Sequence, residues 1–228
     1  MADSSTHLLG ATALCSFAAT LVAKGLGTGP ADALLMLGAG VAAGVLPDID
    51  LERSRASRAL FTALAALASL GWLFANVARY SAVELWAVAA AIALAVRWPL
   101  MAMFHRIAVH RGALHSLAAA AMWGTLATVG AHRGLGETPE IAWMVGAFTV
   151  FGYLVHLAMD EIWSVDFSGA RIKRSFGTAL KPIDFRRLPG SIAIVTTTLI
   201  AWFFTPPTAT AVATARALAG GWRAALLP

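Results

Sequence analysis

Seven stretches of the chain are almost free of charged side chains, and short polar segments separate them. A helix needs about 20 mostly apolar residues to cross a bilayer. The first two stretches are short and rich in Gly and Ala, which is typical of helices that are tilted, half-inserted or buried among others. The pattern predicts an all-α bundle of six or seven membrane helices, over residues 8–23, 31–46, 59–78, 83–104, 113–131, 141–163 and 191–205.

Three local features refine this bundle. Gly40 and Gly44 form a small face that lets helices approach closely. Arg97 lies inside the fourth stretch, where it either snorkels to the interface or has a functional role. The tail after Phe204 is predicted as a short surface helix or a partial return span. No repeat or linker divides the chain, so residues 1–228 are predicted to form one membrane-embedded domain, with the last span and tail at 191–228.

The composition supports a membrane protein. Hydrophobic residues make up 59% of the 228 residues and charged residues only 13%, whereas an ordinary soluble domain is roughly 45–50% apolar and about 25% charged. The mean hydropathy is +0.73. Cys15 is the only cysteine, so an internal disulfide is excluded, and we interpret it as a small packing residue.

The basic residues predict an orientation. If all seven stretches span, segments 47–58, 105–112 and 164–190 lie on one side with the N-terminus, and together they hold eleven Lys and Arg residues. The segments on the other side hold only Lys24, Arg79 and Arg133. By the positive-inside rule, the N-terminus and the basic loops face the cytoplasm of a bacterial-type inner membrane.

The first candidate for chemistry is the sequence Pro47-Asp48-Ile49-Asp50, which ends a Gly-rich apolar stretch. Two carboxylates so close together suit hard or borderline divalent cations. Taken alone, the motif is also typical of a turn or a helix cap.

The second candidate is the run His110-Arg111-Gly112-Ala113-Leu114-His115-Ser116. His110 is predicted in a loop and His115 in the first turn of the next helix, with Gly112 permitting a tight turn between them. The two imidazoles either converge on one ion or are interfacial histidines of a basic loop.

The third candidate pairs His156 with Asp160, which share one helix face because they lie four residues apart. Either both side chains bind one metal ion, or the Asp160 carboxylate orients the His156 imidazole. His7 begins the first stretch on the same predicted side. His105 is predicted to assist the site or to be solvated, and His132 falls on the opposite side.

Seven side chains are thus predicted at one membrane level as metal ligands: His7, Asp48, Asp50, His110, His115, His156 and Asp160. Seven exceed one tetrahedral zinc site, so two or more ions are expected. The sequence has no Walker loop, dinucleotide fingerprint, G-x-S-x-G elbow or H-E-x-x-H motif.

With these motifs, the chain resembles the YdjM-type family, the LexA-regulated, membrane-bound, metal-dependent hydrolases, over about residues 6–182. The resemblance rests on Thr6-His7, Gly44 to Asp50, His110 to Ser116, and His156-x-x-x-Asp160. It implies a multi-span helical protein with a metal centre akin to that of zinc-dependent phospholipase C. The seven predicted ligands carry over from it. The chain departs from many relatives after Asp160, where a longer basic loop puts the substrate in question.

The sequence therefore predicts a zinc-type hydrolase that acts on a phospholipid or related phosphate ester at the cytoplasmic membrane surface. Manganese or another divalent ion remains an alternative to zinc. In this hypothesis Asp50 or Asp160 accepts the proton of the attacking water, and Arg111 holds the substrate anion with Arg171, Lys173 and Arg174. The same three basic residues are equally typical of an anchor for anionic headgroups.

Two other functions stay open. One is a metal-ion carrier or sensor without hydrolysis, although a carrier typically places its ligands near mid-membrane. The other is a membrane-anchored interaction protein. The basic loop 164–190 lacks a helix-turn-helix or zinc-finger pattern, so nucleic acid is not expected as a partner.

Overall fold

The computed structural model describes residues 4–50, 54–107, 112–166, 171–172, 177–178, 180–186 and 188–226. Helix makes up 81% of the structure, and each of the seven predicted apolar stretches contains a helix. The helices are α1 (Ser4–Leu26), α2 (Pro30–Ala43), η1 (Leu46–Asp50), α3 (Arg55–Ala75), α4 (Ala82–Ala95), η2 (Val96–Leu100), α5 (Met101–Ile107), α6 (Leu117–Val129), η3 (Gly130–Gly134), α7 (Pro139–Ile162), α8 (Leu188–Trp202) and α9 (Thr208–Leu226). Two two-residue strands, β1 (Val165–Asp166) and β2 (Arg171–Ile172), pair antiparallel.

Four helical segments are long and apolar enough to cross a membrane: Ser5–Leu26, Ser57–Ala75, Ala82–Arg106 and Pro139–Ile162. The helices α2 and α8 are apolar but shorter. The first segment, which we predicted to be short, is therefore long enough to span. The class of the fold is confirmed as a helical membrane protein, while the count of six or seven spans stays a prediction.

The chain divides into two compact units, one made of residues 1–47 and 111–228 and the other of residues 48–110. The sequence pattern did not predict this division, because no linker marks it.

The second unit is a helical hairpin. Ser54 caps α3 by accepting a hydrogen bond from the backbone of Ser57, and Ser81 with Glu84 forms a capping box at the start of α4. Pro99 lies within η2, a π-helical turn, where the missing N–H of proline breaks the regular α-helical pattern. A hydrogen bond of 2.8 Å between Ser57 Oγ and His105 Nε2 joins α3 to α5.

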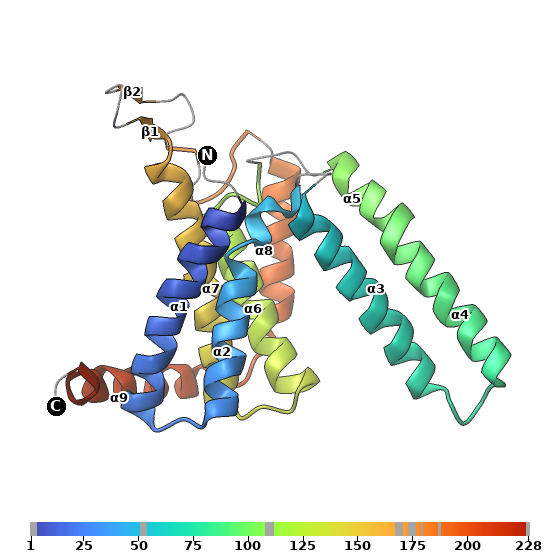
Figure 1. Cartoon of the computed structure of the whole chain (residues 1–228), viewed down its shortest axis with the longest axis horizontal. Helices are drawn as coiled ribbons and strands as arrows, with labels where there is room; N and C mark the ends of the chain where they lie inside the picture. Colours follow the sequence, from blue (N-terminus) through green and yellow to red (C-terminus); the bar gives the residue numbers. More distant parts are fainter. Residues whose placement is uncertain are drawn as a thin grey trace. The chain divides into compact units, whose positions relative to one another are not determined.

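The first unit is built around α7. This helix has 14 buried residues, and α1, α2 and α6 pack against it, with α8 packing on α6 (Figure 1). Large apolar side chains such as Leu9 and Phe17 on α1 point outward and are 70% and 60% exposed. Such a surface suits lipid contact and would favour aggregation in water.

Glycines allow α2 to approach its neighbours closely. A Cβ added at Gly152 on α7 would collide with the backbone of Gly40 on α2, and one at Gly44 would collide with Ala11 on α1. A Cβ at Gly40 would lie 2.6 Å from Cys15 Sγ. The predicted small face at Gly40 and Gly44 is confirmed, as is the packing role of the fully buried Cys15.

The last helix, α9, runs across the end of α1 rather than along it (Figure 1). It contacts α1 and α7, and its Gly221 packs against Gly25 near the end of α1. Of the two predictions for the tail, this arrangement fits a surface helix. Aromatic side chains gather at the same end, where the Trp143 and Trp202 rings lie 5.7 Å apart and the Trp143 indole donates to the Pro207 carbonyl. Trp residues at one level are typical of a membrane interface.

Candidate metal centre

Four of the predicted ligands come together at one end of the first unit. His7 lies in the first turn of α1, His115 directly before α6, and His156 and Asp160 in the last two turns of α7. All four are buried, and their exposed fractions do not exceed 1%. Ligand atoms of His7, His156 and Asp160 lie within 4.8 Å of one another. Residues more than 100 positions apart in the sequence therefore form a single polar cluster.

The orientation of His156 is fixed by a backbone carbonyl. Its Nδ1 lies 2.8 Å from the oxygen of Gly44. Because a carbonyl can only accept a hydrogen bond, Nδ1 carries the proton, and in a neutral ring Nε2 then holds the lone pair. A histidine whose second nitrogen donates to a carbonyl is the arrangement usual for metal ligands.

Asp160 lies between two other imidazoles. His7 Nε2 is 3.5 Å from Asp160 Oδ1, and His115 Nε2 is 3.7 Å from Asp160 Oδ2. Both distances are too long for good hydrogen bonds. Zinc–ligand distances are roughly 2.0–2.2 Å, so two ligand atoms on one tetrahedral zinc ion lie about 3.4 Å apart. The observed spacing is thus close to that of neighbouring ligands around an ion.

Ring contacts complete the geometry of the cluster. The His7 and His156 rings stack with centroids 3.7 Å apart and an interplanar angle of 14°, and the His115 ring meets His156 edge-on at 5.8 Å. Within the described part of the chain, His7 Nδ1 is buried without a hydrogen-bond partner. A buried carboxylate among three imidazoles requires positive charge nearby, from a protonated imidazole or a bound cation. The donor set, three nitrogens and one carboxylate, fits a zinc-type ion.

The turn that carries His115 is held by several hydrogen bonds. Its backbone N–H donates to Gly112 at 3.1 Å, and Ser116 caps α6 by accepting from Ala119 at 3.2 Å. The Tyr153 hydroxyl on α7 donates to the carbonyl of Leu114. His115 therefore lies just before the helix rather than in its first turn, because Ser116 takes the cap position.

The segment after α7 is tied to the same region through Glu161. Its carboxylate accepts the backbone N–H groups of Gly177 at 2.7 Å and Leu180 at 3.3 Å. The carbonyl of Lys181 accepts from Leu117 at 3.0 Å, in the first turn of α6. Glu161 is not among the predicted site residues, although a second acidic residue next to Asp160 inside an apolar stretch is a signal for it.

None of the other predicted site residues is a described side chain of the first unit. Asp48 is the first residue of the second unit and is buried, and Asp50 ends η1, with its side chain outside the described part. His110, Arg111, Lys173 and Arg174 lie outside the described residues, and Arg171 is described only by its backbone in β2. Their roles stay predictions.

The two other histidines also have local partners. His105 bonds Ser57 within the second unit. His132 Nδ1 lies 2.9 Å from the Glu137 carbonyl oxygen. His132 follows the C-terminal end of α6, whereas His115 precedes its N-terminal end. His132 is thus away from the cluster, as predicted.

Comparisons with known proteins agree with the predicted resemblance. No curated protein and no solved structure matches the chain. The family model described as YdjM inner membrane protein matches residues 1–228, the whole chain and more than the stretch from which the resemblance was predicted. The helical architecture and the full-length match agree, and the chain belongs to the YdjM family of inner membrane proteins.

Proposed function

We propose that the protein is a metal-dependent hydrolase, and specifically a phosphoesterase acting on a phospholipid or related phosphate ester at the membrane surface. The observation that carries the proposal is the buried cluster of His7, His115, His156 and Asp160. A second support is its position at helix ends, in the first turn of α1 and the last turns of α7, both of which are long enough to span.

The position of the cluster favours a substrate at headgroup depth. A helix of 22 residues is about 33 Å long, which matches the roughly 30 Å hydrocarbon core. If α1 crosses the bilayer, His7 lies near the boundary between the hydrocarbon and the headgroups. A carrier is expected to hold its ion near mid-membrane, so the helix-end location favours hydrolysis over transport.

In the proposed mechanism, His7, His115 and His156 hold the metal through their imidazole nitrogens. When bound, a zinc-type ion lowers the pKa of its water and polarises a phosphoryl oxygen. Gly44 fixes the His156 ring by accepting its Nδ1–H. Asp160 either completes the ligand set or accepts the proton of the attacking water. Asp48, Asp50 and His110 are proposed as further ligands, which would allow a second ion, and Arg111 is proposed to hold the substrate anion.

The orientation is also part of the proposal. Eleven Lys and Arg residues lie in segments 47–58, 105–112 and 164–190, against three in the connections on the other side. This asymmetry supports placing the N-terminus and the cluster at the cytoplasmic face.

The proposal is tested by measuring metal content and hydrolysis together. The purified protein is expected to hold at least one zinc or manganese ion by elemental analysis and to hydrolyse a phosphodiester or phosphomonoester lipid analogue. His156→Ala and Asp160→Asn should lose both properties. His132→Ala is the matched control, because it removes an imidazole away from the cluster.

Three outcomes would overturn this function. Wild-type protein without bound metal would remove the basis of the site. Full metal retention in His156→Ala would show that the cluster is not the binding place. Metal uptake into proteoliposomes without hydrolysis of any phosphate ester would favour a carrier.

A further inference from the structure

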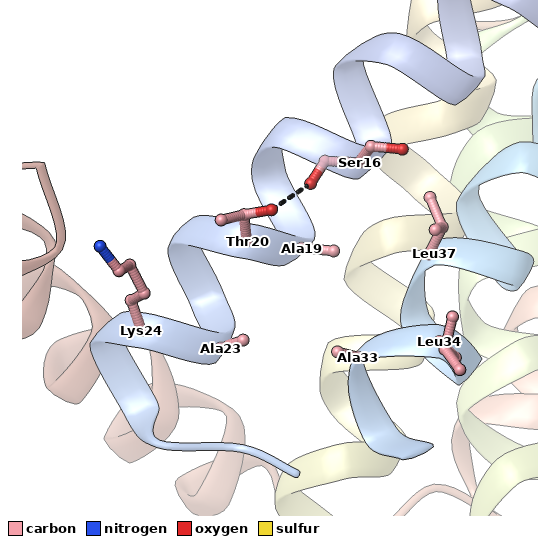
Figure 2. A pocket seen from close by; sticks show the side chains of 8 residues that line it. All are labelled: Ser16, Ala19, Thr20, Ala23, Lys24, Ala33, Leu34 and Leu37. Carbon is pink, nitrogen blue, oxygen red and sulfur yellow. Dashed lines mark hydrogen bonds between the residues drawn. The ribbon is translucent and has the colours of Figure 1, made fainter. Parts of the chain in front are cut away.

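A groove lies on the first unit between α1 and α2, away from the histidine cluster. Its volume is about 440 Å³. On α1 it is lined by Ser16, Ala19, Thr20, Ala23 and Lys24, which recur at the three- and four-residue spacing of one helix face. On α2 it is lined by Ala33, Leu34 and Leu37. Figure 2 shows Ala19, Ala23 and Ala33 facing the space between the two helices.

The lining residues explain why the groove exists and which kind of ligand it would bind. Three alanines leave room that longer side chains would fill, and the polar group of Thr20 is already used, because its hydroxyl donates to the Ser16 carbonyl at 2.9 Å (Figure 2). The surface offered to an occupant is therefore mainly hydrocarbon. The part of α1 from Ser16 to Lys24 is about 12 Å long, which is enough for a substantial part of one acyl chain.

Lys24 supplies a charge at one end of this hydrocarbon surface. It is exposed and lies at the end of α1, on the outer side of the helix in Figure 2. Within the described part of the chain, Lys24 belongs to none of the ion pairs His7–Asp160, His115–Asp160 and Lys181–Asp184. A flexible four-carbon stem lets its ammonium group reach an anion at the mouth of the groove.

The depth of Lys24 matches that of a lipid headgroup. α1 is long enough to span, and Lys24 is at the end opposite His7. The same end of the unit carries the Trp143 and Trp202 pair and the crossing helix α9, both typical of a membrane interface. The groove thus begins at headgroup level and continues towards the bilayer interior.

We infer that the α1–α2 groove binds one anionic phospholipid, with its phosphate at Lys24 and an acyl chain against the three alanines. Hydrocarbon along the groove and a cation at its interfacial end complement the two parts of such a lipid. The site lies at the opposite membrane face from the histidine cluster, so it is separate from the proposed hydrolytic site and does not depend on it.

The test uses the full-length protein in detergent, with added phosphatidylglycerol or phosphatidylcholine of the same chain length, and measures binding by native mass spectrometry. Wild type is expected to bind phosphatidylglycerol more tightly than phosphatidylcholine. Lys24→Gln should lower the phosphatidylglycerol affinity about fivefold, equivalent to the roughly 1 kcal/mol that one basic residue contributes beside anionic lipid. Lys24→Arg should restore it.

Matched controls separate the groove from general charge and helix effects. Arg216→Gln removes an exposed cation from α9 at the same end and should leave binding unchanged. Ala33→Leu fills the groove and should weaken binding of both lipids. Ala31→Leu makes the same change on α2 at an exposed position that does not line the groove, and should have no effect.

The inference is overturned if Lys24→Gln binds phosphatidylglycerol as wild type does, or if both lipids bind equally well. It is also overturned if glycerol phosphate, which has no acyl chain, competes at the same concentration as the lipid. Metal content is measured in every variant and should not change. A variant that loses lipid selectivity but keeps its metal content informs only on the groove. Absence of metal in the wild-type protein would contradict only the proposed hydrolase function.

Discussion

The close approach of α7 to α2 at Gly152 allows one quantitative prediction, for the substitution Gly152→Ala. A Cβ at this position would lie 2.7 Å from the carbonyl carbon and 3.0 Å from the Cα of Gly40, and closer still to its oxygen. Ordinary contacts begin near 3.4 Å. Because the obstructing atoms are backbone, no side-chain rotation relieves the collision. The carbonyl carbon alone requires α2 and α7 to separate by about 0.7 Å, and the oxygen requires more.

The cost of this separation extends to the histidine cluster. Overpacking a tight core typically costs about 1–3 kcal/mol, and we expect the upper part of that range because backbone must move. Gly44, one turn beyond Gly40, accepts the His156 hydrogen bond at 2.8 Å. A shift of this size would lengthen the bond beyond ordinary hydrogen-bond distance. Gly152→Ala should therefore lower both stability and metal affinity without changing a proposed ligand.

Thermal unfolding in detergent, followed by circular dichroism, and metal content by elemental analysis measure the two effects. Gly38→Ala is the control, because it makes the same change on α2 where no atom lies within 4 Å; it should be neutral or slightly stabilising. An unfolding temperature and a metal content of Gly152→Ala equal to those of Gly38→Ala would contradict this prediction.

Three further predictions concern contacts that support the two units. Treating wild type with a chelator should lower its unfolding temperature, since a ligand that binds only the folded state stabilises it, while His156→Ala should show no chelator effect. Ser57→Ala should destabilise the protein by roughly 1 kcal/mol in thermal unfolding, because it removes the hydrogen bond to His105 within the membrane hairpin, and an unchanged unfolding temperature would contradict this. Glu161→Gln should speed limited proteolysis near residues 177–180, because a neutral amide accepts the two backbone hydrogen bonds more weakly; an unchanged cleavage rate would show that these bonds do not hold the segment.

Much of the helical architecture followed from the apolar pattern, because lipid requires long uninterrupted apolar helices. The pattern could not show that residues 48–110 form a unit of their own, since this depends on which helices contact one another. It also could not show the π-turn at Pro99 as such. The alternation of apolar and polar segments gives the order of helices, and packing decides how they group.

The ligand side chains of the candidate site were predictable from the sequence, but the backbone contacts that hold them were not. Spacing placed His156 and Asp160 on one face of a helix, and topology placed His7 at the same level. The hydrogen bond from His156 to the Gly44 carbonyl was not predictable. Every residue has a backbone carbonyl, so the sequence does not show which one accepts this bond. The anchoring of Gly177 by Glu161 depends likewise on a chain reversal that no local pattern specifies.

The helix α7 carries Gly152, His156 and Asp160 at successive four-residue steps. The face that meets α2 most closely thus continues into the face that carries the polar cluster. Membrane helices insert first and associate afterwards, so His7 and Asp160 are brought together only in the second of these stages. An ion bound by this cluster would therefore be acquired late in biogenesis, and its presence would distinguish assembled chains from chains that are only inserted.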